Sequence, residues 1–348
     1  MTELIVTNLN PRYTGVSSTA ARLVRVQANA YDLALAGFAL PDCPAPVSIP
    51  QARALSRKPS NGRTCAVWHV RRNTEMRAAL WARDVLRLPI RIVFTTAGTH
   101  RHSAFPRWLM GRMDALIATM PASAEGKPNL AAIVPHGVDC DIWHPSEDRA
   151  AAWAATGYPG ARGVAAVGRI RDSKGTDRFV DVMLRVLPKV PDVTALVLGQ
   201  CRPQHQPFLD GLKAKVAAAG LADRLLFPGE VAPANMPALI RACSLTVPLP
   251  RYEPYGMTPL EGMASAVPFV GAPTGNFRTF AADGHAGVVV AEANLVADAA
   301  AAVEALLRDT DRLAAMSKAA RARAVDVHSI QAEMAGIGKV YDMLWAKG

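Results

Sequence analysis

Short apolar runs alternate with amphipathic stretches along the chain, and this alternation predicts strands separated by helices. In the first half we expect strands at 3–8, 31–40, 65–70, 91–96, 114–120 and 131–137, with helices at 18–29 and 74–86. In the second half we expect strands at 163–170, 193–199, 224–229, 244–250 and 267–272, with helices at 176–187, 208–220, 236–243, 258–266 and 296–309. Strands and helices in alternation are typical of doubly wound α/β proteins.

The length of 348 residues is about twice that of a typical domain and favours two domains. The stretch 144–163 is rich in Ala, Gly and Pro, and we interpret it as the connection between them. We therefore expect one domain at 1–150 and a second at 151–327. Two Rossmann-like domains with a cleft between them bind ligands at the carboxyl ends of their strands.

Composition excludes several classes of protein. Half of the residues are apolar and a fifth are charged, which is the composition of a globular protein and not of a disordered one. No apolar run reaches the ~18–20 residues that span a bilayer, and the first ten residues lack the basic segment of a secretory signal. Five scattered cysteines without a CxxC pair indicate reduced thiols in a cytoplasmic protein, with no disulfide framework or zinc site.

Positive charge is concentrated in the first third of the chain. Residues 1–112 hold 16 Lys and Arg against 5 Asp and Glu, a net charge of +11, whereas residues 113–348 hold 23 against 24, a net charge of −1. This asymmetry favours an anionic partner for the first domain, and the candidates are nucleic acid, an anionic membrane surface or a phosphorylated substrate. The alternative explanation is that the excess of positive charge serves only to keep the protein soluble.

Two carboxylates flank a turn in the second half. Glu253 and Glu261 lie in the segment YEPYGMTPLE, which follows an apolar strand and leads into a predicted helix. Amides at the start of such a helix form a site for hydroxyl and phosphate oxygens, and an ionised glutamate suits sugar hydroxyls because it accepts two strong hydrogen bonds. The alternative is a surface acid followed by a helix acid that favours the helix dipole.

A second loop follows the first strand of the second half. The segment GRIRDSKG, at 168–175, places Arg169 and Lys174 between glycines just beyond the strand end. Glycines let the backbone approach a diphosphate, and the two cations neutralise it. A solvated basic loop is the alternative, but both loops are expected at one edge of the same sheet. Glycine motifs typical of dinucleotide-binding and P-loop proteins are missing from both halves.

These motifs together resemble the retaining GT-B glycosyltransferases of family 4. GRIRDSKG is followed by the E-x7-E pair of Glu253 and Glu261, PHGVD at 135–139 resembles the PNGVD element of that family, and TGVSS at 14–18 resembles its glycine-containing loop near the amino terminus. WHVRRNTEM at 68–76 and RHSAFPRW at 101–108 further resemble bacterial lipopolysaccharide-core mannosyltransferases. The resemblance implies an α/β fold of GT-B architecture, with two Rossmann-like domains facing each other across a cleft. It also implies that 328–348 is a helix that either stays with the second domain or crosses back to the first, as in relatives.

The resemblance assigns roles at the donor site. Arg169 and Lys174 are expected to neutralise the donor diphosphate, and Glu253 to hold the hydroxyls of the transferred sugar. The remaining expected donor contacts are the amides of Gly256 and Met257 against the transferred sugar, Glu261 on the nucleotide ribose, and Gly15 in the loop that approaches the diphosphate. The family retains the anomeric configuration without a divalent metal or other cofactor, and a leaving phosphate oxygen assists the acceptor. The two glutamates are therefore not assigned as an acid and base pair.

Histidines and arginines of the first domain are candidates for the reacting centre and the acceptor. Many relatives carry a histidine directly after the strand that ends near Ala97, and His102, or else His100, is expected to supply that contact; both are otherwise exposed loop histidines. His69 is a further candidate for an acceptor-facing position in the cleft, and His136 is interpreted as a turn residue at the hinge. Basic side chains suited to an acceptor carboxylate or phosphate, unless they are merely solvated, are Arg71, Arg72, Arg101 and Arg107.

The leading hypothesis is a metal-independent, retaining hexosyltransferase. It moves mannose from GDP-mannose to an anionic, lipid-linked acceptor of the lipopolysaccharide core, as a peripheral protein at the inner leaflet of the cytoplasmic membrane. The alternative is a family-4 enzyme of exopolysaccharide or another glycoconjugate that uses a UDP- or ADP-sugar. A nucleic-acid-binding protein is disfavoured because aromatic-rich basic ribbons and zinc spacings are missing from the sequence. A catalytically inactive homologue is disfavoured by the intact Arg169, Lys174, Glu253 and Glu261.

Overall fold

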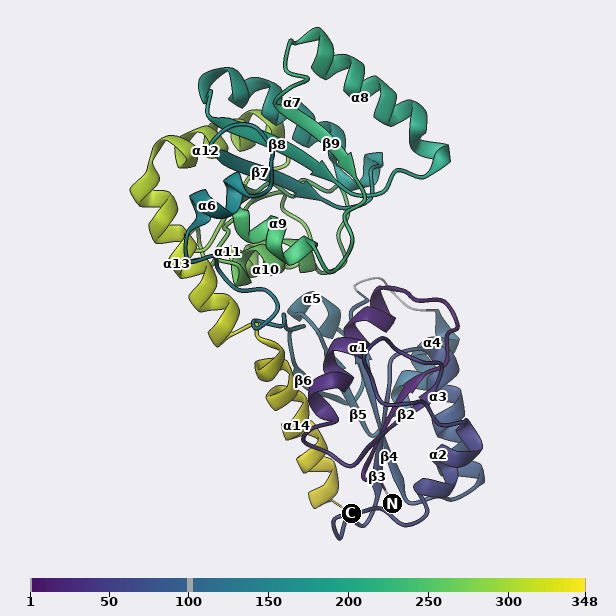
Figure 1. The fold of residues 1–348 in the computed structure, drawn as a ribbon. Helices are drawn as coiled ribbons and strands as arrows, with labels where there is room; N and C mark the ends of the chain where they lie inside the picture. The colour runs from purple at the N-terminus through teal and green to yellow at the C-terminus, as the bar shows by residue number, and fades with distance from the viewer. Residues whose placement is uncertain (1, 99–102, 348) are drawn as a thin grey trace. The chain divides into compact units, whose positions relative to one another are not determined.

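A computed structural model describes residues 2–98 and 103–347 of the chain. The chain forms two compact units (Figure 1). The first contains Met1–Gly137 together with His328–Gly348, and the second contains Val138–Val327. The chain therefore leaves the first unit after Gly137 and returns to it at His328, so that the carboxy-terminal segment belongs to the first unit.

The first unit is built on a six-stranded parallel sheet in the order β2-β1-β3-β4-β5-β6. Four of its strands, β1, β3, β4 and β5, are buried almost throughout because helices cover both faces, which explains their continuous apolar runs, whereas the edge strand β6 is largely exposed. The strands are β1 (Leu4–Asn8), β2 (Leu33–Gly37), β3 (Ala66–Val70), β4 (Ile90–Thr96), β5 (Ala115–Ala118) and β6 (Leu130–Ile133).

Helices cover the two faces of this sheet separately (Figure 1). One core cluster joins the sheet to α3 and α4, through Met76, Ala79, Leu109 and Met110 among others. The opposite cluster joins it to α1 and α14. The helical segments of this unit are α1 (Gly15–Gln27), α2 (Ile49–Leu55), α3 (Asn73–Leu80), the π-helical segment η1 (Trp81–Val85), α4 (Ala104–Gly111), α5 (Pro121–Ala124) and α14 (Ile330–Ala346).

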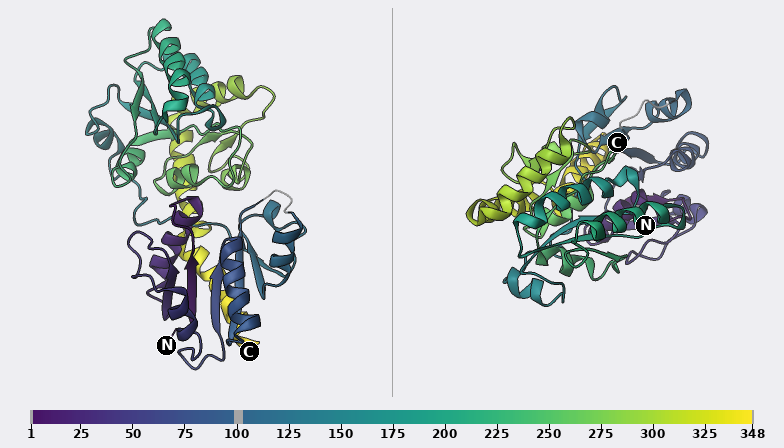
Figure 2. Two further views of the ribbon diagram at one scale, coloured as in Figure 1. Left: turned by 90° about the vertical axis from the view of Figure 1, so that its right-hand side faces the viewer. Right: turned by 90° about the horizontal axis from the view of Figure 1, so that it is seen from above.

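The last helix of the chain, α14, is an integral part of the first unit (yellow in Figure 2). Tyr341 and Trp345 are buried against the sheet, and the indole Nε1 of Trp345 donates a hydrogen bond to the carbonyl of Cys65 at 3.1 Å. The guanidinium of Arg63 lies 4.0 Å from the centre of the Trp345 ring. Aromatic burial of this kind contributes on the order of 2–3 kcal/mol per side chain.

The second unit contains a four-stranded parallel sheet in the order β10-β7-β8-β9 and a separate parallel pair, β11-β12. The strands are β7 (Arg162–Val167), β8 (Val193–Leu198), β9 (Leu225–Gly229), β10 (Cys243–Thr246), β11 (Val270–Gly271) and β12 (Val288–Val289). The helical segments are α6 (Arg149–Ala154), η2 (Asp172–Lys174), α7 (Thr176–Val186), η3 (Leu187–Lys189), η4 (Pro203–His205), α8 (Gln206–Ala218), α9 (Met236–Ala242), α10 (Met257–Ala264), α11 (Phe277–Ala281), α12 (Leu295–Arg308) and α13 (Thr310–Asp326).

The stretch 144–163 lies inside the second unit and is not an interdomain connection, which corrects the interpretation from sequence. It contains α6, whose Trp153 is fully buried in the core of that unit. Its ring packs so closely on Gly163 that an added Cβ there would lie 2.0 Å from the ring. Along the chain, the boundary between the two units consequently falls at 137–138, whereas the sequence analysis places it at 150–151.

Two further findings concern sulfur and membrane segments. All five cysteines are free thiols, and burial raises the pKa of Cys243 to about 12. Within residues 2–98 and 103–347, no helix combines the length and the apolar character needed to cross a membrane.

Candidate functional site

The two loops singled out in the second unit meet at one edge of its sheet. β7 and β10 are neighbouring parallel strands, with Ala165 paired to Thr246, so their carboxyl ends point the same way. The loop 168–175 follows β7 and the loop 247–256 follows β10. Ligands of open α/β sheets bind at this edge.

The loops are in direct contact because Gly175 has no side chain. Gly175 adopts a left-handed backbone conformation, with φ of 68°, at the start of α7. A Cβ at this position would lie 1.8 Å from the carbonyl oxygen of Leu249 in the other loop. Glycine therefore meets both the backbone requirement and the close approach.

Contact between the loops brings Lys174 and Glu253 together. The Nζ atom of Lys174 lies 2.7 Å from Oε2 of Glu253, and the two side chains are 25% and 19% exposed. The amide of Glu253 also donates a hydrogen bond to the hydroxyl of Thr274 at 3.2 Å. The ion pair thus orients both charged groups while leaving each accessible to a ligand.

Lys174 and Glu253 line a cavity with an empty volume of about 560 Å³. Its other walls are mostly backbone and apolar side chains, with the ion pair as the charged part of the lining. The lining residues are Ala166, Val167, Gly168, Lys174, Gly175, Thr176, Val197, Val247, Pro248, Leu249, Pro250, Glu253, Thr258, Pro259 and Phe277.

Gly256 and Met257 lie where α10 begins, beside this cavity. Gly256 has φ of 109°, and a Cβ would lie 2.3 Å from the ring of Phe277. No side chain caps the helix, so its first amides remain available to an anion or a hydroxyl group. Glu261 follows one turn after Met257 on the same helix and is partly buried.

Arg169 lies beside this cavity and does not line it. It borders a smaller hollow together with Arg171 and Arg202. Partial burial, followed by repulsion from these two arginines, lowers the pKa of Arg169. The two predicted diphosphate ligands are therefore placed differently. Lys174 lies in the cavity with Glu253, whereas Arg169 lies in an adjacent group of arginines.

Two predicted site residues belong to the first unit. Gly15 is the first residue of α1, whose N-cap Thr14 accepts a hydrogen bond from the amide of Ser17. A Cβ at Gly15 would meet nothing within 4 Å, so the structure leaves space beside it. His102, with His100 and Arg101, lies outside the described residues.

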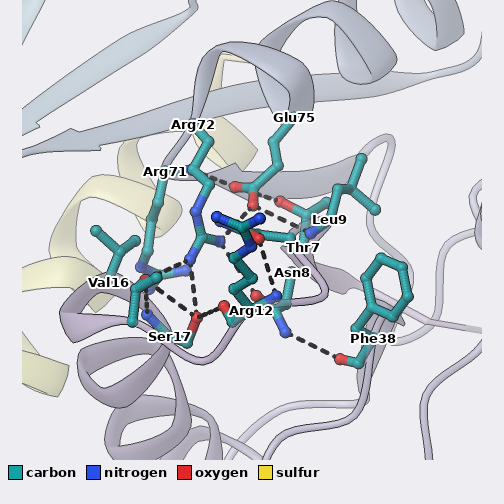
Figure 3. Close-up of polar contacts among 12 residues, drawn as sticks. Thr7, Asn8, Leu9, Arg12, Val16, Ser17, Phe38, Arg71, Arg72 and Glu75 are labelled. Atoms are coloured by element: carbon teal, nitrogen blue, oxygen red, sulfur yellow. Dashed lines mark hydrogen bonds and ion pairs between the residues drawn. The ribbon is translucent and has the colours of Figure 1, made fainter. Parts of the chain in front are cut away.

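Sequence reasoning missed a buried carboxylate in the first unit, Glu75 (Figure 3). Its side chain is fully buried and accepts four hydrogen bonds. The donors are the hydroxyl of Thr7 at 3.1 Å, the amide of Leu9 at 3.2 Å, the amide of Arg71 at 2.7 Å and the Nη1 atom of Arg72 at 2.9 Å. Glu75 thereby fastens the ends of β1 and β3 to each other. The available signal was an acid in the first turn of a helix, three residues after Arg72.

Arg72 extends this network to the start of α1. Its Nη1 atom donates to Asn8, and its Nη2 atom donates to the hydroxyls of Thr14 at 3.2 Å and Ser17 at 2.9 Å (Figure 3). The guanidinium is thus engaged by protein groups, and its role toward an acceptor stays a prediction. Arg71 differs, because its buried Nη1 atom has no hydrogen-bond partner among the described residues.

His69 is a core residue and does not face a cleft, contrary to its interpretation from sequence. It is fully buried in β3, with Nε2 at 2.7 Å from the hydroxyl of Thr95 and Nδ1 at 2.5 Å from the hydroxyl of Tyr341. Burial, followed by repulsion from Arg71, lowers the pKa of His69 well below its usual value. Its neutral form is therefore favoured in the folded protein.

His136 lies in the segment where the chain leaves the first unit. Its Nδ1 atom is 2.9 Å from Oε1 of Glu333 in α14, and the other carboxylate oxygen accepts a hydrogen bond from the amide of Gly137 at 2.8 Å. A Cβ on Gly137 would lie 2.4 Å from the carbonyl oxygen of Ser329. Glu333 thus joins the outgoing segment to the returning one. Among the residues that the structure describes, His, Cys, Asp and Glu side chains form no group of three suited to a metal ion.

Comparisons with known proteins relate the chain to enzymes of sugar transfer. The family model described as glycosyl transferases group 1 matches residues 158–323. The lipopolysaccharide core biosynthesis mannosyltransferase LpsB of Rhizobium meliloti (strain 1021) is 40% identical over 348 residues, which cover 98% of this chain and 97% of that protein. The corresponding enzyme LpcC of Rhizobium leguminosarum bv. viciae is 36% identical, over 98% of this chain and 96% of that protein.

A solved structure shows the same fold. HepE of Anabaena in complex with UDP superimposes with a TM-score of 0.82, over 98% of this chain and 100% of that one, at 16% sequence identity. At this low identity the similarity concerns the fold of the two proteins.

Proposed function

Since this chain belongs to the group 1 glycosyltransferases, we propose that it transfers mannose from GDP-mannose to a lipid-linked saccharide of the lipopolysaccharide core. Its fold is the GT-B arrangement of two Rossmann-like domains, as predicted from sequence. The mannose, the guanine nucleotide and the lipid-linked acceptor belong to the proposal. The names of the two rhizobial relatives support mannose and the lipopolysaccharide core, and the resemblance of the sequence motifs supports the guanine nucleotide and the lipid-linked acceptor.

The observation that carries the proposal is the ion pair of Lys174 and Glu253 in the cavity at the carboxyl edge of the second sheet. Lys174 supplies a positive charge for the donor diphosphate, and Arg169 in the adjacent loop supplies a second one. Glu253 accepts hydrogen bonds from the hydroxyls of the transferred sugar. On binding, the diphosphate competes with Glu253 for Lys174, so that the glutamate becomes available to the sugar.

The start of α10 completes the proposed donor site. The amides of Gly256 and Met257 lie against the sugar, and Glu261, one turn later, binds the ribose. Positive potential at a helix N-terminus stabilises the negative charge that develops on the leaving diphosphate. In this mechanism the configuration at the anomeric carbon is retained, a leaving phosphate oxygen takes the proton of the acceptor hydroxyl, and no metal ion takes part.

The first unit supplies the acceptor side of the proposal. Its basic portion, with a net charge of +11 over residues 1–112, attracts an anionic acceptor and the inner leaflet of the cytoplasmic membrane. Gly15 at the start of α1 allows the backbone to approach the diphosphate, and His102 contacts the sugar or the reacting centre. Nucleic acid is not part of the proposal.

A donor screen by thermal shift tests the proposal most directly. GDP-mannose, UDP-sugars and ADP-sugars are compared at equal concentration with the wild type and with Lys174→Met. A ligand at 100 times its dissociation constant stabilises the folded protein by about 2.7 kcal/mol. We expect the largest shift with GDP-mannose and its loss in the variant. A larger shift with a UDP- or ADP-sugar supports the exopolysaccharide alternative, and a shift that persists in Lys174→Met refutes the assigned site.

A further inference from the structure

Five large apolar side chains of the first unit are exposed, and four of them line one groove. Trp81 and Val85 of η1 and Leu86 just after it are 51%, 54% and 43% exposed, and Phe105 and Trp108 of α4 are 54% and 55% exposed. We call these five residues the aromatic face. Isolated apolar side chains are common on protein surfaces, but a contiguous group of this size marks an interaction site.

The aromatic face surrounds a shallow groove between η1 and α4. The groove has an empty volume of about 680 Å³ and is lined by Arg77, Leu80, Trp81, Asp84, Val85, Phe105, Trp108 and Leu109. The rings of Phe105 and Trp108 are stacked, with centroids 6.1 Å apart. The exposed side chains on the two walls of the groove therefore form one continuous apolar surface. They are Trp81, Val85, Phe105 and Trp108.

Ion pairs hold the two walls of the groove together. Arg83 pairs with Asp84 and with Asp114, and Asp84 also pairs with Arg112. The Arg112 guanidinium in turn lies 5.4 Å from the centre of the Trp108 ring. The two segments that carry the aromatic face are thus linked to each other by ion pairs.

The acid that lines the groove, Asp84, is already neutralised by arginines, which leaves an excess of cations. Residues 73–112 contain seven arginines and two acidic residues, Glu75 and Asp84. Both acids are engaged by arginines in ion pairs. Arg77, Arg87 and Arg107 are exposed and form no ion pair within the described part of the chain. Arg77 lines the groove and Arg107 precedes Trp108 in α4, so unpaired positive charge lies beside the aromatic face.

We propose that the aromatic face is the surface by which this protein docks on an anionic lipid bilayer. Indole rings partition into the interfacial region of a bilayer, and arginine side chains reach the lipid phosphates beside them. Each basic residue near an anionic bilayer contributes about 1 kcal/mol to binding. A second copy of this chain fits less well, because two faces of the same positive charge repel each other.

This docking deepens the proposed transfer to a lipid-linked acceptor, and it rests on that proposal only for its biological purpose. A few inserted side chains with nearby charges give reversible binding and not permanent anchoring. The unit that the resemblance assigns to the acceptor is thereby brought to the bilayer. Vesicle binding is measurable without any turnover, so a failure of docking and a failure of the proposed activity are distinguishable.

Vesicle flotation with the full-length protein tests the proposal. The vesicles contain phosphatidylcholine alone or a mixture of phosphatidylcholine with phosphatidylglycerol. We expect binding to the anionic vesicles only, with weakening by at least tenfold in Phe105→Ser/Trp108→Ser. Arg77→Gln/Arg107→Gln is expected to weaken binding about 25-fold, as two charges are lost. The matched control is Lys213→Gln/Lys318→Gln, which removes two exposed lysines of the second unit and leaves binding unchanged.

Several outcomes overturn the proposal. They are equal binding of the wild type to neutral vesicles, the absence of binding to either kind, and unchanged binding by both groove variants. Sedimentation without vesicles identifies the other occupant: if the wild type self-associates and Phe105→Ser/Trp108→Ser does not, the aromatic face joins two protein copies. Thermal unfolding of each variant establishes that a loss of binding is not a loss of folding.

Discussion

Lys174 and Glu253 are 79 residues apart in the sequence and form a 2.7 Å ion pair across two loops of the second unit. This contact holds both side chains in place, so in the proposed donor site a diphosphate replaces an existing contact and does not order two free side chains. Long side chains that are already oriented lose less conformational entropy on binding.

Replacement of Lys174 by methionine is expected to reduce kcat/KM by about 10- to 150-fold, which corresponds to loss of a charge-assisted hydrogen bond to phosphate. The free energy of unfolding should change by less than about 1 kcal/mol because the ion pair is partly exposed. Lys215→Met is a matched control, since Lys215 pairs with Asp181 on the surface of the same unit. Steady-state kinetics with the donor that gives the largest thermal shift measure both variants, and equal losses in the two would contradict the donor site.

Gly256→Ala is expected to destabilise the second unit by about 2–4 kcal/mol and to abolish the donor-induced thermal shift. The substitution places a Cβ 2.3 Å from the ring of Phe277 and forces an alanine to adopt φ of 109°. Gly211→Ala provides the comparison, because Gly211 lies inside α8 with open space around it, and it should gain about 0.5–1 kcal/mol. Calorimetry of the two variants shows whether the loss of unfolding free energy is specific to the turn at Gly256. If Gly256→Ala is as stable as the wild type, the positive φ and the close approach to Phe277 are excluded.

Glu75→Gln is expected to cost about 3–5 kcal/mol, because it removes the charge of a fully buried carboxylate that accepts four hydrogen bonds. The same change at Glu292, an exposed partner of Arg178, should cost at most about 1 kcal/mol. Hydrogen exchange should show faster opening at the start of α1 in Glu75→Gln, since Arg72 links the carboxylate to Thr14 and Ser17. Unchanged exchange there would mean that Arg72 holds the helix without Glu75.

The first unit should lose stability as the pH falls below about 6.5. His69 has a lowered pKa in the folded protein, so the unfolded chain binds a proton near pH 6.5 that the folded chain does not bind. The free energy of unfolding should therefore fall by up to about 1.4 kcal/mol for each pH unit until the folded pKa is reached.

Hydrogen exchange at the β3 amides, corrected for its intrinsic pH dependence, measures this slope. His69→Gln should flatten it, whereas His144→Gln, at an exposed position of the second unit, should leave it unchanged. The same slope in wild type and His69→Gln would show that His69 does not carry the pH dependence.

The central strands were predictable because they are buried on both faces and therefore apolar throughout. The run 65–70 predicted β3 within one residue, and the run 193–199 predicted β8. The meeting of the loops after β7 and β10 was predictable from the same rule, because adjacent parallel strands end at one edge. The contact of Gly175 with Leu249 was not, since it depends on how closely the two loops approach.

Misinterpreted residues have partners that are distant in sequence. His69 was assigned to a cleft, but its partner Tyr341 is 272 residues away. Glu75 was overlooked because its role depends on distant partners such as the amide of Leu9, 66 residues before it. The stretch 144–163 has the composition of a linker, and only the packing of Trp153 on Gly163 shows that it belongs to a core. Local patterns carry no information about such long-range pairs.

The position of α14 sets the order in which the chain completes its folding during synthesis. Residues 1–137 leave the ribosome first, but their core still lacks Ile337, Tyr341, Leu344 and Trp345. At typical rates of translation, roughly 10–40 s pass before the last helix emerges. In that interval the second unit, Val138–Val327, is synthesised in full and can fold completely. The unit that is translated first is therefore the unit that completes its folding last. One core cluster of its sheet stays incomplete until the seventeen-residue helix α14 is synthesised.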